Sequence, residues 1–243
     1  MTECRYSQFT YLEIKEKAKG DFTIVIPTGC TEQQGPHLTV DFDTWFAETL
    51  MVESVIKAMD NYNFKGIVIP TLPFGPTPEH KNYLHGYIHL PQEIFEQVLH
   101  SVVLSLIEQG FKRFVIWRGC GGHQVNRVIN RITREYGDTI QIFNPSHPFY
   151  NVWCKVADPS IPGGHADSFT TSISLYKRPE TVRENLISNP NSNEPEWEDG
   201  NLDFSKYSKT GVIGDPTKAS KELGRKLWEE TVNQVIEILK DLS

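Results

Sequence analysis

Four short apolar segments recur along the chain and predict the strands of a buried sheet. They are continuous and rich in β-branched residues, instead of alternating between apolar and polar positions. Such runs are typical of parallel strands that are covered by helices on both faces. The four segments are residues 22–29, 65–75, 111–122 and 139–145.

The stretches between these segments show apolar residues at helical spacing. Pro91 favours a helix start, because proline fits the first helical turn, and Gly110 favours the end of that helix. Asp215 is the predicted N-cap of the last helix, with Pro216 in its first turn. The predicted helices cover residues 44–60, residues 91–109, a stretch that begins near Gly122, and a C-terminal stretch that begins at "GDPTKAS".

The alternation of strands and helices predicts a layered α/β fold with a largely parallel sheet. In open α/β sheets, ligands bind beyond the carboxyl ends of the strands. Polar, glycine-rich loops follow three of the predicted strands, namely "TGCTEQQGPH", "PFGPTPEH" and "RGCGGH". We therefore expect the functional side chains of these loops to meet at one edge of the sheet.

Length, charge and cysteine content narrow the class of protein. A chain of 243 residues can bury a core of its own, so we expect one domain over residues 1–243, with the polar stretch 183–210 as a surface excursion. The net charge of −7 gives no reason to expect nucleic acid or an anionic membrane as partner. No membrane span or secretory signal is visible, so we expect a cytoplasmic protein whose four separated cysteines are reduced.

Three residues are potential ligands for a divalent ion: Glu32, Asp43 and Cys120. Carboxylate and thiolate together suit Zn²⁺ or Fe²⁺ better than Mg²⁺, which prefers oxygen ligands. A purely structural interpretation competes with this one. The two carboxylates could cap or position loops, and the cysteine could be a small residue in a tight glycine turn.

Cys120 also suggests nucleophilic chemistry. Two glycines and a predicted helix follow it, and a helix N-terminus lowers a thiol pKa and favours the thiolate. His165 is a candidate general acid or base, because histidine titrates near neutral pH, and Asp167 could orient it. Alternatively, Asp167 or Ser168 caps a helix.

Arg118 and His123 flank Cys120 and are candidate substrate contacts. A guanidinium group suits bidentate contact with a carboxylate or phosphate, so Arg118 favours an anionic substrate. An ion pair within the fold is the alternative role for this arginine. His80 and the aromatic residues near it could line a pocket.

Five motifs together resemble those of the creatininase (creatinine amidohydrolase) family, in the family's order and over almost the whole chain. The family begins with a pattern like G-S-x-E-Q-H-G-P-H-L-P and continues with elements that include N-G-H-G-G-N. Five motifs at sensible intervals are far more specific than any one of them. In this chain they are "GCTEQQGPHLTVDFDT" (29–44), "GPTPEH" (75–80), "RGCGGH" (118–123), "HADSFTTS" (165–172) and "GVIGDPTKA" (211–219).

The resemblance implies a three-layer αβα sandwich that assembles as a homo-oligomer, such as a hexamer. It also implies hydrolysis of the C–N bond of a small cyclic amide, linear amide or formamide. The family uses two metal ions, Zn²⁺, Mn²⁺ or iron, which lower the pKa of a bound water and polarise the carbonyl. By position, Glu32 matches the first family carboxylate, Asp43 the bridging aspartate and His165 the histidine that transfers the proton.

Other family positions are changed in this chain. Gln34 and Cys120 stand where the family has metal-binding histidines, and Thr170 or Gly122 supplies no carboxylate for the second ion. We therefore expect one ion, Zn²⁺ or alternatively iron or manganese, at Glu32, Asp43 and Cys120. Gln34 is a weak neutral ligand, and we group it with Arg118 and His123 as a substrate contact.

Three hypotheses about function follow. The first is a hydrolase of a small amide, lactam or formamide with a mononuclear metal site, in which His165 moves protons. The second is a metal-free enzyme in which Cys120 is the nucleophile in acyl transfer or cyclisation, with Glu32, His123 or His165 as base. The third is a non-catalytic homologue that binds a small molecule or supports a partner enzyme.

Overall fold

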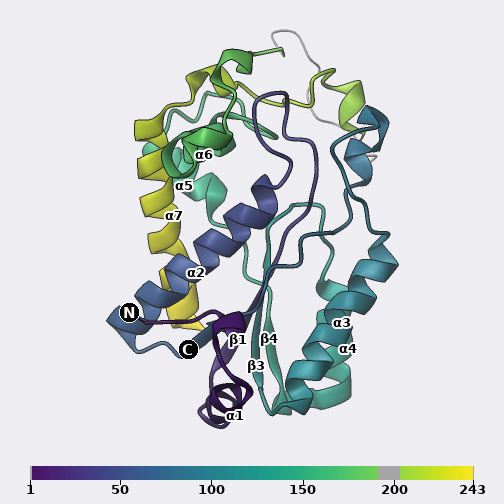
Figure 1. Cartoon of the computed structure of the whole chain (residues 1–243), viewed down its shortest axis with the longest axis vertical. Coiled ribbons are helices and arrows are strands. Elements are labelled where there is room, and N and C mark those ends of the chain that lie inside the picture. Colours follow the sequence, from purple (N-terminus) through teal and green to yellow (C-terminus); the bar gives the residue numbers. More distant parts are fainter. Residues whose placement is uncertain (1, 191–202, 243) are drawn as a thin grey trace.

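The protein folds around one four-stranded parallel sheet, as shown by a computed structural model that describes residues 2–190 and 203–242 (Figure 1). The strands lie in the order β2-β1-β3-β4, so the chain passes from one side of β1 to the other. Each of the four predicted segments contains one strand, and each strand is shorter than its segment. The strands are β1 (Thr23–Thr28), β2 (Gly66–Val68), β3 (Arg113–Arg118) and β4 (Gln141–Phe143).

Helices cover both faces of the sheet, which confirms the predicted three-layer αβα fold. In Figure 1, α3 and α4 lie on one side of the strands, while α2, α5, α6 and α7 lie on the other. The helices are α1 (Tyr11–Lys19), α2 (Phe42–Tyr62), α3 (Gln92–Glu108), α4 (Asn126–Tyr136), α5 (Phe149–Val156), α6 (Ser168–Lys177) and α7 (Lys221–Asp241). Short 3₁₀ helices lie at η1 (Tyr6–Gln8), η2 (Pro78–Tyr83), η3 (Gly137–Thr139), η4 (Pro179–Thr181), η5 (Glu184–Leu186), η6 (Phe204–Lys206) and η7 (Pro216–Lys218).

Each face of the sheet has its own apolar core, because successive strand residues point to opposite faces. Ile24 and Ile26 of β1 belong to the core that contains the buried residues of α3 and α4. Val25, between them, belongs to the core shared with α2 and α7. All six residues of β1 are buried, which explains why its sequence is apolar throughout instead of alternating.

Three predicted helix starts need correction. The third predicted helix, α4, begins at Asn126 and not near Gly122, because the preceding residues form the turn that holds Cys120 and His123. Asp215 caps only the short 3₁₀ helix η7, and Ser220 is the N-cap of α7. Pro91 is the N-cap residue of α3 instead of its first helical residue.

The predicted surface excursion at residues 183–210 lies partly outside the described residues. In the part of this stretch that follows the gap, Phe204 packs against two histidines. The centre of its ring lies 4.9 Å from that of His80 and 5.3 Å from that of His165. Within residues 2–190 and 203–242, no helix is both long and apolar enough to cross a membrane.

Candidate active site

The loops that follow β1, β2 and β3 meet at the carboxyl edge of the sheet and line a cavity of about 770 Å³. The first loop provides Glu32 and Gln34, the second provides Glu79, and the third provides Cys120. His165 joins them from the segment just before α6. The parallel strands therefore bring together polar residues that are far apart in the sequence.

Glu32 lies at the centre of this polar group, with 2 % of its surface exposed. Its Oε1 atom lies 3.2 Å from Nε2 of His165 and 3.2 Å from Nε2 of His80. Gln34 also donates to Oε1 from its amide nitrogen, at 3.4 Å. Burial raises the pKa of the Glu32 carboxyl, but the hydrogen bonds and charges of the two histidines outweigh it and hold this pKa well below its usual range.

Asp43 brings a second carboxylate to the same place from the first turn of α2. Its Oδ2 atom accepts hydrogen bonds from the Cys30 thiol and from the amide of Gln34, both at 3.1 Å. Burial and the nearby charge of Glu32 raise the pKa of Asp43 well above its usual range. Glu32 is buried and Asp43 is half-buried, and a cation between two such neighbouring carboxylates would stabilise both.

The donor chemistry of this group fits a divalent metal ion. One ligand atom from each of Cys30, Glu32, Asp43 and Cys120 lies within 4.8 Å of the others. The three residues predicted as ligands are thus brought together, and Cys30 joins them. Two further groups overlap with this one: Glu32 with His80 and His165, and the two cysteines with His123.

Cys120 does not lie at a helix N-terminus, so that part of the nucleophile hypothesis is wrong. Five residues lie between it and the first residue of α4, Asn126. Its contact with the Cys30 thiol lowers the pKa of Cys120, but burial and the charges of Glu32 and Asp43 raise that pKa to about 11. Without a bound cation, Cys120 is therefore a protonated and poorly nucleophilic thiol at neutral pH.

His165 is oriented by a backbone carbonyl and not by Asp167. Its Nδ1 atom lies 2.8 Å from the carbonyl oxygen of Gly211, so an N–H at this atom donates to the carbonyl. Asp167 is the N-cap of α6 and accepts hydrogen bonds from the amides of Phe169 and Thr170, which confirms the structural alternative for this residue. The Gly211 carbonyl leaves Nε2 of His165 facing Glu32.

Two chemically important residues, Cys30 and Glu79, received no role from the sequence, and His80 was expected only to line a pocket. His80 has no exposed surface, and its Nδ1 atom lies 2.9 Å from the amide nitrogen of Gln33. The motif "GPTPEH" marked Glu79 and His80 as part of a family element, but their contacts depend on how the loops after β1 and β2 pack. Cys30 looked like an isolated cysteine, because its partner Cys120 lies ninety positions later.

Glu79 places a carboxylate close to Gly122, one of the positions that supplies no carboxylate for the family's second ion. A Cβ atom added at Gly122 would lie 3.3 Å from Oε1 of Glu79. The other carboxylate oxygen of Glu79 is buried without a hydrogen-bond partner. Burial, together with the charge of Glu32, raises the pKa of Glu79 to about 7.

This raised pKa gives a testable dependence of stability on pH. In metal-free protein, the folded state holds the Glu79 proton up to about pH 7, while an unfolded carboxyl loses it near 4.5. Wild-type protein therefore loses stability as the pH rises from about 4.5 to 7. At pH 8 Glu79→Gln should be more stable than wild type by up to about 3 kcal/mol. At pH 4 the two proteins should be equally stable. Thermal unfolding of chelator-treated protein measures this, with the exposed Glu108→Gln as control. Equal stabilities at pH 8 would contradict the raised pKa.

The predicted substrate contacts divide into two groups. Gln34 lines the cavity, whereas Arg118 and His123 are absent from its described lining residues. Arg118 donates to the backbone carbonyl of His123 at 3.4 Å, and the His123 side chain is fully buried. Direct substrate contact by all three residues stays a prediction.

Comparison with known proteins agrees with this architecture. A family model described as creatininase, creatinine amidohydrolase, matches residues 7–239. The chain is 27 % identical over 242 residues to a protein of Mycobacterium tuberculosis (strain CDC 1551 / Oshkosh) named mycofactocin precursor peptide peptidase, covering 88 % of this chain and 83 % of the relative. It is 23 % identical over 258 residues to the creatinine amidohydrolase of Pseudomonas putida, covering 96 % and 95 % of the two chains.

Solved structures show the same fold. A protein of Bacteroides fragilis NCTC 9343, named after creatinine amidohydrolase, superposes with a TM-score of 0.85 at 24 % identity, covering 100 % of this chain and 97 % of the other. A mutant creatininase of the Zn–Zn type superposes with a TM-score of 0.84 at 18 % identity, covering 99 % and 98 %. With the family model matching nearly the whole chain, we conclude that this protein belongs to the creatininase family and is a hydrolase of C–N amide bonds.

Proposed function

We propose that the protein hydrolyses a small amide, lactam or formamide, with a divalent metal ion held by Glu32, Asp43 and Cys120 and with His165 as the proton-transfer group. The observation that supports this most directly is the contact of 3.2 Å between Nε2 of His165 and Oε1 of Glu32, beside Asp43 in the wall of the cavity. A general acid needs this kind of position, because it must reach the leaving nitrogen from a fixed place.

The metal requirement is supported by the donor set and by relatives. The carboxylates of Glu32 and Asp43 repel each other without a cation. The family-related structures include a creatininase of the Zn–Zn type and a creatininase with Mn. A bound metal ion would polarise the amide carbonyl and lower the pKa of a water molecule. Carboxylate and thiolate ligands together favour Zn²⁺, with iron or manganese as alternatives.

Other residues of this chain orient the proton donor and position the carboxylates. The Gly211 carbonyl fixes the orientation of the His165 ring, and Glu32 keeps a proton on Nε2 by pairing with it. His165 can then deliver that proton to the nitrogen that leaves when the C–N bond breaks. Gln34 donates to both Glu32 and Asp43 and so keeps their oxygens facing each other.

The lining of the cavity favours a small, flat substrate. Aromatic side chains line it together with the carboxylates, among them Phe46, Phe149, Trp153 and Phe169. These rings would stack against a planar amide or ring, while the polar end receives the reacting carbonyl. The hexamer implied by the family resemblance stays a prediction.

A substrate panel tests this function. Purified protein is incubated with lactams, linear amides and formamides after loading with Zn²⁺, Mn²⁺ or Fe²⁺, and product is detected by mass spectrometry. We expect turnover of at least one class, its loss on chelation, and its return when the metal is restored. Turnover that persists after complete removal of metal would favour metal-free chemistry, and no turnover with any metal would contradict the proposal.

A further inference from the structure

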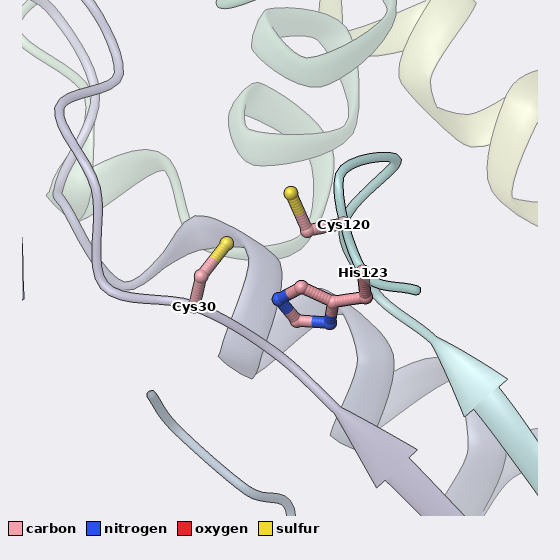
Figure 2. A group of neighbouring side chains, drawn as sticks. All are labelled: Cys30, Cys120 and His123. Atoms are coloured by element: carbon pink, nitrogen blue, oxygen red, sulfur yellow. The ribbon is translucent and has the colours of Figure 1, made fainter. Parts of the chain in front are cut away.

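Cys30 and Cys120 bring their sulfur atoms together at the end of the sheet. They come from the loops after β1 and β3, and Figure 2 shows both thiols beside the imidazole of His123. Cys30 Sγ, Cys120 Sγ and a ring nitrogen of His123 lie within 4.8 Å of one another. All three residues are buried.

The imidazole of His123 is held so that one nitrogen is free for a ligand. Its Nδ1 atom lies 2.9 Å from the hydroxyl oxygen of Thr28, and that hydroxyl donates to the carbonyl of Trp117 at 3.4 Å. Because the hydroxyl proton is used in this way, Nδ1 carries a hydrogen and donates it to Thr28. Nε2 then keeps its lone pair, and it is buried without a hydrogen-bond partner.

His123 and Thr28 are arranged like a metal-binding histidine and the residue that orients it. Ligand histidines commonly donate their second ring N–H to a neighbouring oxygen, which fixes the tautomer and the ring orientation. The Nδ1 contact with Thr28 and the partnerless Nε2 of His123 match this pattern. Figure 2 shows the free edge of the ring directed toward Cys30.

We propose that Cys30, Cys120 and His123 form a thiolate–imidazole site for Zn²⁺ or a similarly soft divalent ion. Two sulfurs and one nitrogen are donors that select zinc over Mn²⁺ and Mg²⁺, and three protein ligands leave a fourth tetrahedral position open. Ligand atoms around tetrahedral zinc lie about 3.6–3.8 Å apart, given Zn–S of about 2.3 Å. The ligand atoms of the site lie within 4.8 Å of one another, so binding requires them to approach by up to about 1 Å.

At all three positions of this site, the residue differs from the one in the family patterns. The family patterns have serine, histidine and asparagine at positions 30, 120 and 123, whereas this chain has Cys30, Cys120 and His123. The site lies next to the one proposed at Glu32 and Asp43 and shares Cys120 with it. It rests on the proposed function for its metal requirement, but it assigns two ligands, Cys30 and His123, that the family pattern lacks. Glu32 then lies beside the ion, since its Oε2 is 3.1 Å from the Cys30 sulfur and 3.9 Å from the Cys120 sulfur.

Titration with Co²⁺ tests this site without any knowledge of the substrate. Apo protein is titrated under reducing conditions, and the near-ultraviolet thiolate-to-cobalt charge-transfer band is recorded together with the dissociation constant. The variants Cys30→Ser and His123→Asn restore the residues of the family pattern and should therefore fold. Each should weaken Co²⁺ binding more than about 100-fold, since losing even an orienting partner of a ligand costs about 10–100-fold.

Two further variants sharpen the result. Thr28→Val removes only the partner of Nδ1 and should weaken Co²⁺ binding by about 10–100-fold. The exposed Cys154→Ser should leave binding and spectrum unchanged. In wild type, Zn²⁺ should displace Co²⁺ and remove the band, while Mn²⁺ should not.

The proposed site is overturned if either Cys30→Ser or His123→Asn keeps the wild-type affinity and charge-transfer band. Loss of binding only in Asp43→Asn and Cys120→Ser would likewise overturn it and leave the family ligand set in place. Failure of the hydrolase proposal can be told apart from failure of this site. In that case the Co²⁺ spectra and affinities would be as expected, but the substrate panel would show no turnover.

Discussion

Replacing His165 by asparagine is expected to lower kcat/KM for the amide substrate by about 10²–10⁴-fold, the usual contribution of a positioned acid or base. The reason is that His165 lines the cavity with its Nε2 paired to Glu32 at 3.2 Å, and the proposed function makes this nitrogen the proton donor. Asparagine keeps a polar group of similar size but cannot transfer a proton. Steady-state kinetics on the substrate found in the panel measure the effect, and the exposed His85→Asn serves as control.

The pH profile separates a proton-transfer role from a structural one. Burial lowers the pKa of His165, but the hydrogen bond and charge of Glu32 raise it above 6.5 overall. Activity that needs the protonated ring should therefore fall as the pH rises through this raised pKa, and His165→Asn should lack that alkaline limb. The ion pair between His165 and Glu32 stabilises the folded state with the same pH dependence. This stabilisation is complete below about pH 6.5 and is lost as the pH rises through the folded-state pKa of His165. A variant with the wild-type profile and normal kcat would exclude His165 as the acid.

Replacing Asp43 by asparagine is expected to remove the metal from the carboxylate pair and to lower metal-dependent turnover by about 10³-fold. Metal activation of a carbonyl and water is worth several kcal/mol, and about 1.4 kcal/mol corresponds to a tenfold change in rate. Metal content after dialysis, measured by elemental analysis, is compared with that of Glu48→Gln, an exposed change on the same helix. Full metal content and full turnover in Asp43→Asn would show that this residue is not a ligand.

The same variant should be more stable than wild type when both are free of metal. The pKa of Asp43 is raised by burial and by the charge of Glu32, so the folded wild type loses stability as the pH rises above about 3.8. Asparagine removes this effect. The unfolding temperature of the chelated variant should exceed that of chelated wild type at pH 8 and converge with it in acid. A site that gains stability when its charge is removed is kept for function and not for folding.

The sequence predicted the sheet and the edge that carries the site. Continuous β-branched runs identified all four strands. The residues of β1 and β2 and the central residues of β3 are buried, and local composition reflects that burial directly, whereas the edge strand β4 is only partly buried. The three polar loops could be assigned to one edge because parallel strands place their carboxyl ends together. Glu32, Asp43 and Cys120 were predicted to meet on this basis, and the structure brings their ligand atoms together.

Helix starts were less predictable around the site. The glycines after Cys120 looked like the beginning of a helix, but α4 begins only at Asn126. The intervening turn is stabilised by long-range contacts, such as the one between His123 and Thr28, which local spacing does not show. The error mattered for chemistry, because it suggested a lowered thiol pKa where burial and two carboxylates raise it.

The sequence by itself therefore determined the layered fold, the family and the edge that carries the candidate site, since these depend on local periodicity and on motif order. Only the tertiary structure decided which side chains touch: Cys30 with Cys120, His80 with Glu32, and Gly211 with His165. It also decided the protonation of these groups, because a pKa depends on burial and on charges a few ångströms away. Those distances are set by the packing of loops that are far apart in the chain.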